Sequence, residues 1–171
     1  MVNNRKKFGW LLLALLNTQF AIAQAPDWMF ALEGSYVGRY EVPDEAGLIA
    51  VDARWDGKRS GKEDGFVLQI SREYAEGIEK EAQMWNWNAD QNLLDLTTIA
   101  DGRRLSTEWF CTTEGLATTM TRGGNVDGKA AIIRVRLERL PGQLRVQEHC
   151  NFGDGTWQLQ WRYVLDDFFE D

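Results

Sequence analysis

The sequence predicts an all-β fold in which about ten antiparallel strands follow one another as a meander. Short runs of alternating apolar and polar residues are divided by turn residues, and almost no apolar stripe of helical period extends over three turns. The turns contain pairs that favour tight hairpins: Asp101-Gly102, Asp127-Gly128, Pro141-Gly142 and Asp154-Gly155. Because an open sheet of this width would expose long edges, the meander must close into a barrel or fold into two packed sheets.

A short apolar turn from Trp28 to Leu32 precedes the expected strands, and an acidic, aromatic end from Asp166 to Asp171 follows them. We expect this end to be a frayed tail, with Phe168 and Phe169 as candidates for covering the bottom of the core. Glycine-containing and acidic turns separate the strands. In chain order, the strands are expected at Ser35 to Pro43, Gly47 to Trp55, Gly65 to Tyr74, Ile78 to Asn88, Leu93 to Ala100, Arg103 to Thr112, Leu116 to Thr121, Lys129 to Leu140, Gln143 to Phe152 and Thr156 to Leu165.

The first 23 residues have the form of a secretory signal peptide. Basic residues lead into an apolar run from Phe8 to Leu16, and small residues follow at Ala21 and Ala23. The pattern predicts cleavage after Ala23, which leaves residues 24–171 as a single domain, periplasmic or secreted. The alternative, an uncleaved anchor, is disfavoured because the apolar run is shorter than the roughly 20 residues that span a bilayer.

The charge of the expected mature chain argues against nucleic acid and against membrane surfaces as partners. Cleavage removes three of the 19 basic residues and none of the 26 acidic ones, so the formal net charge falls from −7 to −10. Binding to phosphates requires a basic patch, whereas the Arg and Lys residues here are scattered. We therefore expect a soluble protein that neither binds nucleic acid nor inserts into a membrane.

The opening of the first strand carries a family resemblance, in the segment Leu32-Glu33-Gly34-Ser35-Tyr36-Val37-Gly38-Arg39-Tyr40. It resembles lipocalin-like (calycin) barrels, in which a helical turn leads into Gly-x-Trp and a late Arg packs over that ring. Tyr36 stands at the Trp position, and Arg162 on the last expected strand would stack on it. The resemblance implies a lipocalin/fatty-acid-binding-protein-like barrel whose interior holds one small apolar ligand.

Inward-facing aromatic residues are the candidate lining of such a pocket. Glu148 shares a face with Leu144, Val146 and Cys150, so a buried carboxylate would be the polar anchor, with Arg134 or Arg136 as its partner. The alternative is that the aromatic residues only fill the core. The candidate ligand-binding residues are Tyr36, Tyr40, Trp85, Trp87, Trp109, Glu148, Trp157 and Trp161, where Trp157 and Trp161 are expected on one face of the last strand.

The two cysteines, Cys111 and Cys150, are a candidate disulfide because exported proteins fold in an oxidising compartment. In a pure meander, however, both positions lie late in strands that run in opposite directions, toward opposite ends of the barrel. A bridge needs the two Cα atoms within about 7 Å. Three alternatives stay open: free cysteines, a segment from Leu116 to Thr121 that is not a full strand, or a large stagger of the barrel.

Catalytic and cofactor motifs are weak. His149, the single histidine, points to the face opposite Glu148 and Cys150, which argues against a His-rich metal site and a Cys-His pair. No nucleophile elbow, phosphate loop, dinucleotide fingerprint or calcium loop occurs. The pair Glu79 and Glu81 is interpreted as a solvated face. We therefore expect a protein without cofactor, metal or enzymatic activity.

Three functional hypotheses remain. The favoured one is a carrier or sensor of a small hydrophobic molecule. The second is a module that binds a protein partner through Trp55 and the charged loop from Asp56 to Asp64. The third is a barrel enzyme that uses buried carboxylates, which requires a raised pKa at Glu148.

Overall fold

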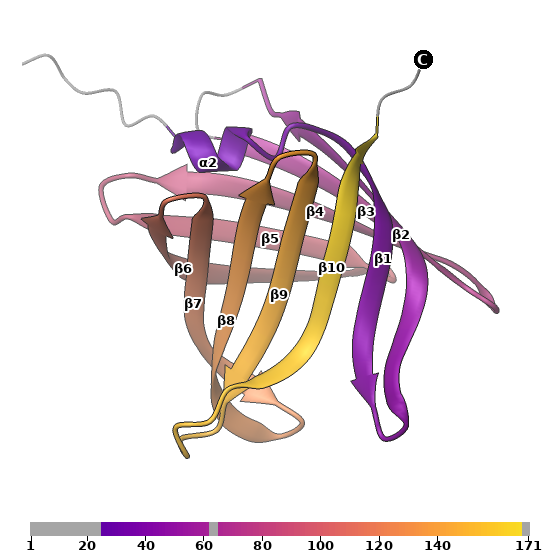
Figure 1. Ribbon diagram of the computed structural model, residues 1–171. Coiled ribbons are helices and arrows are strands. Elements are labelled where there is room, and N and C mark those ends of the chain that lie inside the picture. Colours follow the sequence, from indigo (N-terminus) through magenta and orange to yellow (C-terminus); the bar gives the residue numbers. More distant parts are fainter. Residues whose placement is uncertain (1–24, 62–64, 169–171) are drawn as a thin grey trace, which may run out of the picture.

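The computed structural model describes residues 25–61 and 65–168, and within them the chain forms a closed barrel of ten antiparallel strands (Figure 1). Each strand pairs with the next along the chain, and β1 (Gly34–Asp44) pairs with β10 (Gln158–Phe168) to complete the barrel. This confirms the predicted all-β meander, in its barrel form. The barrel is compatible with a calycin-like fold. The expected signal peptide, residues 1–23, and the expected new N-terminus lie outside the described residues.

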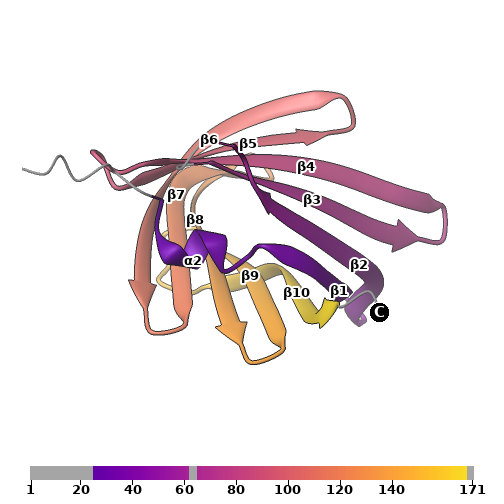
Figure 2. The ribbon, with the colours of Figure 1, turned by 90° about the horizontal axis from the view of Figure 1, so that it is seen from above.

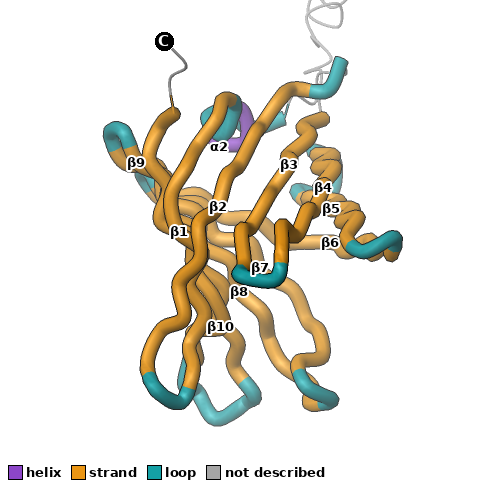
Figure 3. The backbone as a smooth tube through the Cα atoms, turned by 90° about the vertical axis from the view of Figure 1, so that its right-hand side faces the viewer, coloured by secondary structure: helices purple, strands orange, loops and turns teal. Residues whose placement is uncertain are grey.

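Among the described residues, short turns join most consecutive strands, as the backbone tube in Figure 3 shows. Three strands, β3 (Gly65–Tyr74), β5 (Leu93–Ala100) and β8 (Lys129–Leu140), have the bounds that the alternation predicts. Asp101 and Asp127 adopt positive φ in these turns. The other strands are β2 (Gly47–Arg59), β4 (Gly77–Asn88), β6 (Arg103–Glu114), β7 (Ala117–Val126) and β9 (Gln143–Asn151).

A one-turn helix, α2 (Asp27–Phe30), lies across one end of the barrel, as the view from above in Figure 2 shows. Met29 and Leu32 of this segment are buried in the barrel, which confirms the predicted apolar turn. The Tyr36 hydroxyl donates a hydrogen bond to the Ala31 carbonyl at 3.2 Å. In the described part of the chain, no helix is both long and apolar enough to cross a bilayer.

Two predictions are wrong near the seam between β1 and β10: which arginine stacks on Tyr36, and the conformation of the last described residues. Arg139, not Arg162, stacks on Tyr36, with its guanidinium carbon 5.2 Å from the ring centroid. The pleat puts Arg162 on the outer face, where it pairs with Glu41. The predicted frayed tail is also ordered as far as Phe168, because Asp167 accepts hydrogen bonds from Arg139 at 2.8 and 3.1 Å. Phe169 lies outside the described residues.

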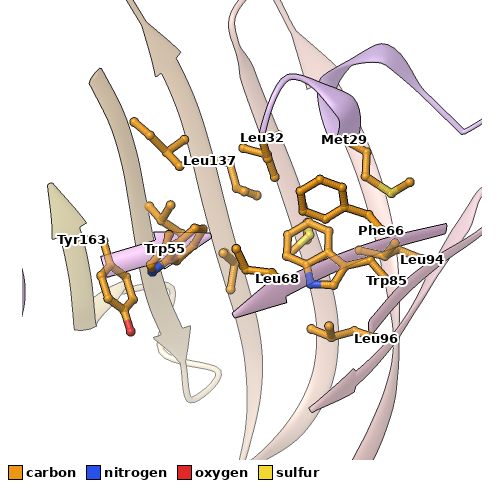
Figure 4. Close-up of a cluster of buried hydrophobic side chains, with 14 of the residues drawn as sticks. Met29, Leu32, Trp55, Phe66, Leu68, Trp85, Leu94, Leu96, Leu137 and Tyr163 are labelled. Carbon is orange, nitrogen blue, oxygen red and sulfur yellow. The ribbon is translucent and has the colours of Figure 1, made fainter. Parts of the chain in front are cut away.

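Below α2, an apolar cluster fills this end of the barrel, as Figure 4 shows. Met29 and Leu32 face Phe66 and Trp85, whose rings are 6.1 Å apart and tilted by 65°. Burial of several large side chains at about 1.5–3 kcal/mol each makes this cluster a main source of barrel stability. Further from α2, the interior is less densely filled.

The two cysteines are free and buried, so the candidate disulfide is not formed. The structure selects the first of the three alternatives, since the segment after Leu116 is a full strand, β7. Burial raises the pKa of the Cys111 thiol to about 12 and also raises that of Cys150. A thiol of this kind is a poor nucleophile near neutral pH.

We expect both thiols of the native protein to resist dithiobis(nitrobenzoate) at pH 8 and to react fully after unfolding in guanidinium chloride. The amount of nitrothiobenzoate released gives the number of reactive thiols in the native and in the unfolded protein. A chain that releases none after unfolding, together with a mass two hydrogens below that of the dithiol, would contradict the free-cysteine structure.

Candidate ligand-binding cavity

The interior of the barrel contains a cavity of about 220 Å³. All ten strands contribute side chains to its wall, and β1, β2 and β10 contribute only aromatic ones. The aromatic lining is Tyr40, Trp55, Trp85, Trp109, Trp161 and Tyr163.

Five of the eight predicted ligand-binding residues line this cavity, and three do not. Those that line it are Tyr40, Trp85, Trp109, Glu148 and Trp161. Tyr36 lies under α2 instead, and Trp87 packs edge-on against Trp28 with ring centroids 6.5 Å apart. Trp157 lies before β10 begins.

A register shift between Leu159 and Trp161 explains the position of Trp157. The extra residue breaks the period-2 alternation, so Trp157 does not share a face with Trp161. Its ring instead lies 3.9 Å from the guanidinium carbon of Arg134. Simple alternation along the expected strand could not reveal this bulge.

Trp55 lines the cavity, whereas the hypothesis of a protein-binding module required it on the surface. It is 3% exposed, and its ring centroid lies 5.0 Å from that of Tyr163, as Figure 4 illustrates. Alternation along β2 with the buried Ala53 was the available signal, because both residues point to the same face. The indole Nε1 of Trp55 is buried and has no hydrogen-bond partner in the part of the chain that the structure describes.

A buried ion pair between Arg72 and Glu81 crosses one wall of the cavity. Arg72 Nη2 lies 2.7 Å from Glu81 Oε2, and the two side chains are 16% and 12% exposed. Glu81 is thus an inward residue and not part of a solvated face. Gln83 donates to Glu81 and accepts from the Trp85 indole at 2.8 Å, so the polar atoms along β4 satisfy one another.

Arg72 also organises the two cavity tyrosines. Its Nε donates a hydrogen bond to the Tyr163 hydroxyl, and its guanidinium carbon lies 4.9 Å from the Tyr40 ring centroid. Burial raises the pKa of Tyr40 to about 12, although the Arg72 charge opposes the shift. Burial likewise raises the pKa of Tyr163, so both hydroxyls are neutral near pH 7.

Comparison of the chain with models of known protein families and with curated proteins finds no match. The function must therefore be inferred from the cavity itself.

A second pair of opposite charges, Arg122 and Glu148, lines the cavity without forming an ion pair between them among the described residues. Burial raises the pKa of the Glu148 carboxyl, and Arg122 and a hydrogen bond from Trp161 oppose this shift. Burial lowers the pKa of Arg122, and Glu148 opposes that shift. The expected partners of Glu148 are engaged elsewhere, since Arg134 stacks on Trp157 and Arg136 pairs with Glu138.

The seam between β6 and β7 is the shortest in the barrel. It joins five residue pairs, from Phe110 with Thr121 to Glu114 with Ala117, whereas the other seams join at least seven. A hollow lies over this part of the wall, and Leu96, Thr107 and Arg122 line both the hollow and the cavity. These three side chains therefore form the part of the wall that separates the cavity from the outer hollow.

The wall of the cavity combines aromatic and polar side chains. In the described chain, no histidine, serine or cysteine lines the cavity. Across the same residues, no group of three or more His, Cys, Asp or Glu side chains is arranged to hold a metal ion. The groups in this wall are aromatic faces, hydroxyl and indole groups, and two charges that form no ion pair among the described residues.

Proposed function

We propose that this protein binds one small organic molecule inside its barrel and acts as an exported carrier or sensor. The observation that carries the proposal is the 220 Å³ cavity, which combines six aromatic side chains with a few polar groups. This combination is typical of ligand sites, where apolar surface supplies affinity and sparse polar groups fix orientation.

The size of the cavity limits the ligand. At about 30 Å³ per water, the space holds about seven waters, and it is smaller than the roughly 300–1,000 Å³ of pockets for larger ligands. We therefore propose a compact molecule with one ring. The buried charges argue against a wholly hydrophobic ligand, because some part of the bound molecule must face them.

The resemblance to lipocalin-like barrels supports a binding role. The helical turn, the aromatic residue at Tyr36 and an arginine stacked on it all occur, although the arginine is Arg139. We propose that the chain is a divergent member of that group on the basis of this arrangement. The alternative of a protein-binding module is weakened because Trp55, its candidate contact residue, is buried.

The direct test is a screen of one-ring compounds by Trp fluorescence and by native mass spectrometry of the mature protein. We expect at least one compound to shift the fluorescence and to appear as a 1:1 complex. A protein that shows neither effect with any compound that fits the cavity would overturn the proposal.

A cavity-filling substitution should abolish binding without unfolding the barrel. Val135 on β8 lines the cavity and is 5% exposed, so Val135→Phe places a ring in the ligand space. We expect at least a tenfold loss of affinity and a stability cost of about 1–3 kcal/mol from overpacking. The matched control is Ile132→Phe on the same strand, where the side chain is 50% exposed and outside the cavity wall. Equal affinities of the two variants would contradict the location of the site.

A further inference from the structure

We propose that the ligand of this cavity is a one-ring aromatic molecule without net charge, with a hydrogen-bond acceptor that faces Arg122 and a donor that faces Glu148. A carboxamide on an aromatic ring is the simplest chemical class of this kind. The inference rests on the proposed function, and it adds the polarity of the ligand and the two residues that recognise it.

The charged side chains that line the cavity balance one another. Four charged residues line it: Arg72, Glu81, Arg122 and Glu148. The first two neutralise each other in direct contact at 2.7 Å. The other two are one cation and one anion, so the formal charges of the described side chains that line the cavity sum to zero. A ligand with a single charge would leave one buried charge in excess, which is costly in a partly dehydrated interior.

The Arg122 guanidinium uses only part of its hydrogen-bonding capacity. Among the described residues, the buried Nε atom of Arg122 has no hydrogen-bond partner, and Nη1 donates to the Gly123 carbonyl at 3.3 Å. The guanidinium is held in place because its carbon lies 4.8 Å from the Trp109 ring centroid. The Trp109 ring is fixed in turn by a 2.9 Å hydrogen bond from its Nε1 to Thr107. Arg122 is thus a fixed cation in the cavity wall whose hydrogen-bonding capacity is only partly used, and an acceptor on the ligand would use it.

The Glu148 carboxylate has acceptor capacity that its neighbours do not use. No ion pair to its carboxylate forms among the described residues, and its hydrogen-bonding neighbour is the Trp161 indole. A carboxylate has two oxygens and about four acceptor sites, so most of its capacity is unused. The raised pKa of Glu148 agrees with a carboxyl group whose charge is poorly compensated. Such a group gains from a donor on the ligand.

A wholly apolar ligand would remove water from both groups and replace no hydrogen bond. Leaving a buried polar group unsatisfied costs about 1–3 kcal/mol, and more where the group is charged. A neutral carboxamide supplies an acceptor oxygen and donor hydrogens within one planar group. The volume is also adequate, because a cavity of about 150 Å³ in another protein accommodates benzene.

Four probes of nearly equal size separate these possibilities: benzamide, benzoate, benzamidine and toluene. At pH 7.5 they are neutral and polar, anionic, cationic and apolar, while sharing one ring. We expect isothermal titration calorimetry on the mature protein to give the tightest binding for benzamide, at least tenfold tighter than for the other three.

Two charge-removing variants test the named residues. Glu148→Gln leaves Arg122 as the uncompensated charge, so benzoate should gain at least tenfold relative to benzamidine. Arg122→Gln leaves Glu148 instead, so benzamidine should gain by a similar factor relative to benzoate. The control is Arg134→Gln, which removes an arginine stacked on Trp157 outside the cavity and should leave the order of the four probes unchanged. Circular dichroism of each variant checks that the barrel is folded.

The outcomes distinguish this inference from the proposed function. Tightest binding of toluene, benzoate or benzamidine to the unchanged protein would overturn the inference and leave a ligand-binding barrel in place. Unchanged preferences in both folded variants would overturn the roles of Arg122 and Glu148. If none of the four probes binds, both the inference and the proposed one-ring ligand are overturned.

Discussion

Replacing Arg72 with methionine is expected to lower the free energy of unfolding by about 3–5 kcal/mol, the cost of breaking a buried ion pair from one side. The substitution keeps most of the side-chain volume but leaves the Glu81 carboxylate, 12% exposed, without its cation. It also removes the donor to the Tyr163 hydroxyl and the cation over the Tyr40 ring. One change therefore breaks a network that joins β3, β4, β10 and β1.

Urea denaturation followed by Trp fluorescence measures this effect. The matched control is Arg136→Met, since Arg136 and Glu138 form an outer ion pair with side chains 49% and 33% exposed. We expect the control to cost about 0–1 kcal/mol, because solvent screens such a pair. Equal costs for the two variants would show that the inner pair does not stabilise the barrel.

The double variant Arg72→Met with Glu81→Gln identifies the cause of the loss. If the uncompensated carboxylate dominates, the double variant should recover most of the stability that the single variant loses. If it recovers none, the contacts of Arg72 with the two tyrosine rings carry the effect instead.

Replacing Gly38 with alanine is expected to cost about 3 kcal/mol, the upper end of the usual range for overpacking. A Cβ atom at this position would lie 2.1 Å from the Val164 carbonyl oxygen and 2.9 Å from the Leu165 Cα. Both are backbone atoms of β10, the strand that closes the barrel against β1. The methyl group can therefore be accommodated only if the closing seam moves apart.

The control is Gly123→Ala, where no described atom lies within 4 Å of the added methyl group and φ is outside the left-handed region. We expect this variant to be as stable as the parent within about 0.5 kcal/mol, as is usual for surface substitutions. Thermal denaturation by circular dichroism compares the two. Equal melting temperatures would mean that the closing seam adapts to a side chain at Gly38 without cost.

Local patterns were sufficient to predict the strands. Alternation with period 2 depends only on neighbouring residues, and the turn residues at Asp101-Gly102 and Asp127-Gly128 restrict φ locally. The same alternation placed Trp85, Trp109 and Glu148 on inward faces, and all three line the cavity. The bulge near Gln160 is the exception, because the extra residue has no recognisable local signal and changes the face of Trp157.

The sequence by itself thus determined the class of fold, the order of the strands and most of the inward-facing aromatic residues. Only the tertiary structure decided which side chains meet across the barrel. Arg72 pairs with Glu81 because β3 and β4 align in one register, whereas Arg122 and Glu148 face one cavity from strands that are not neighbours. The free cysteines follow from the same fact. Contacts across a closed barrel depend on the register of every seam together, and no local stretch of sequence specifies that sum.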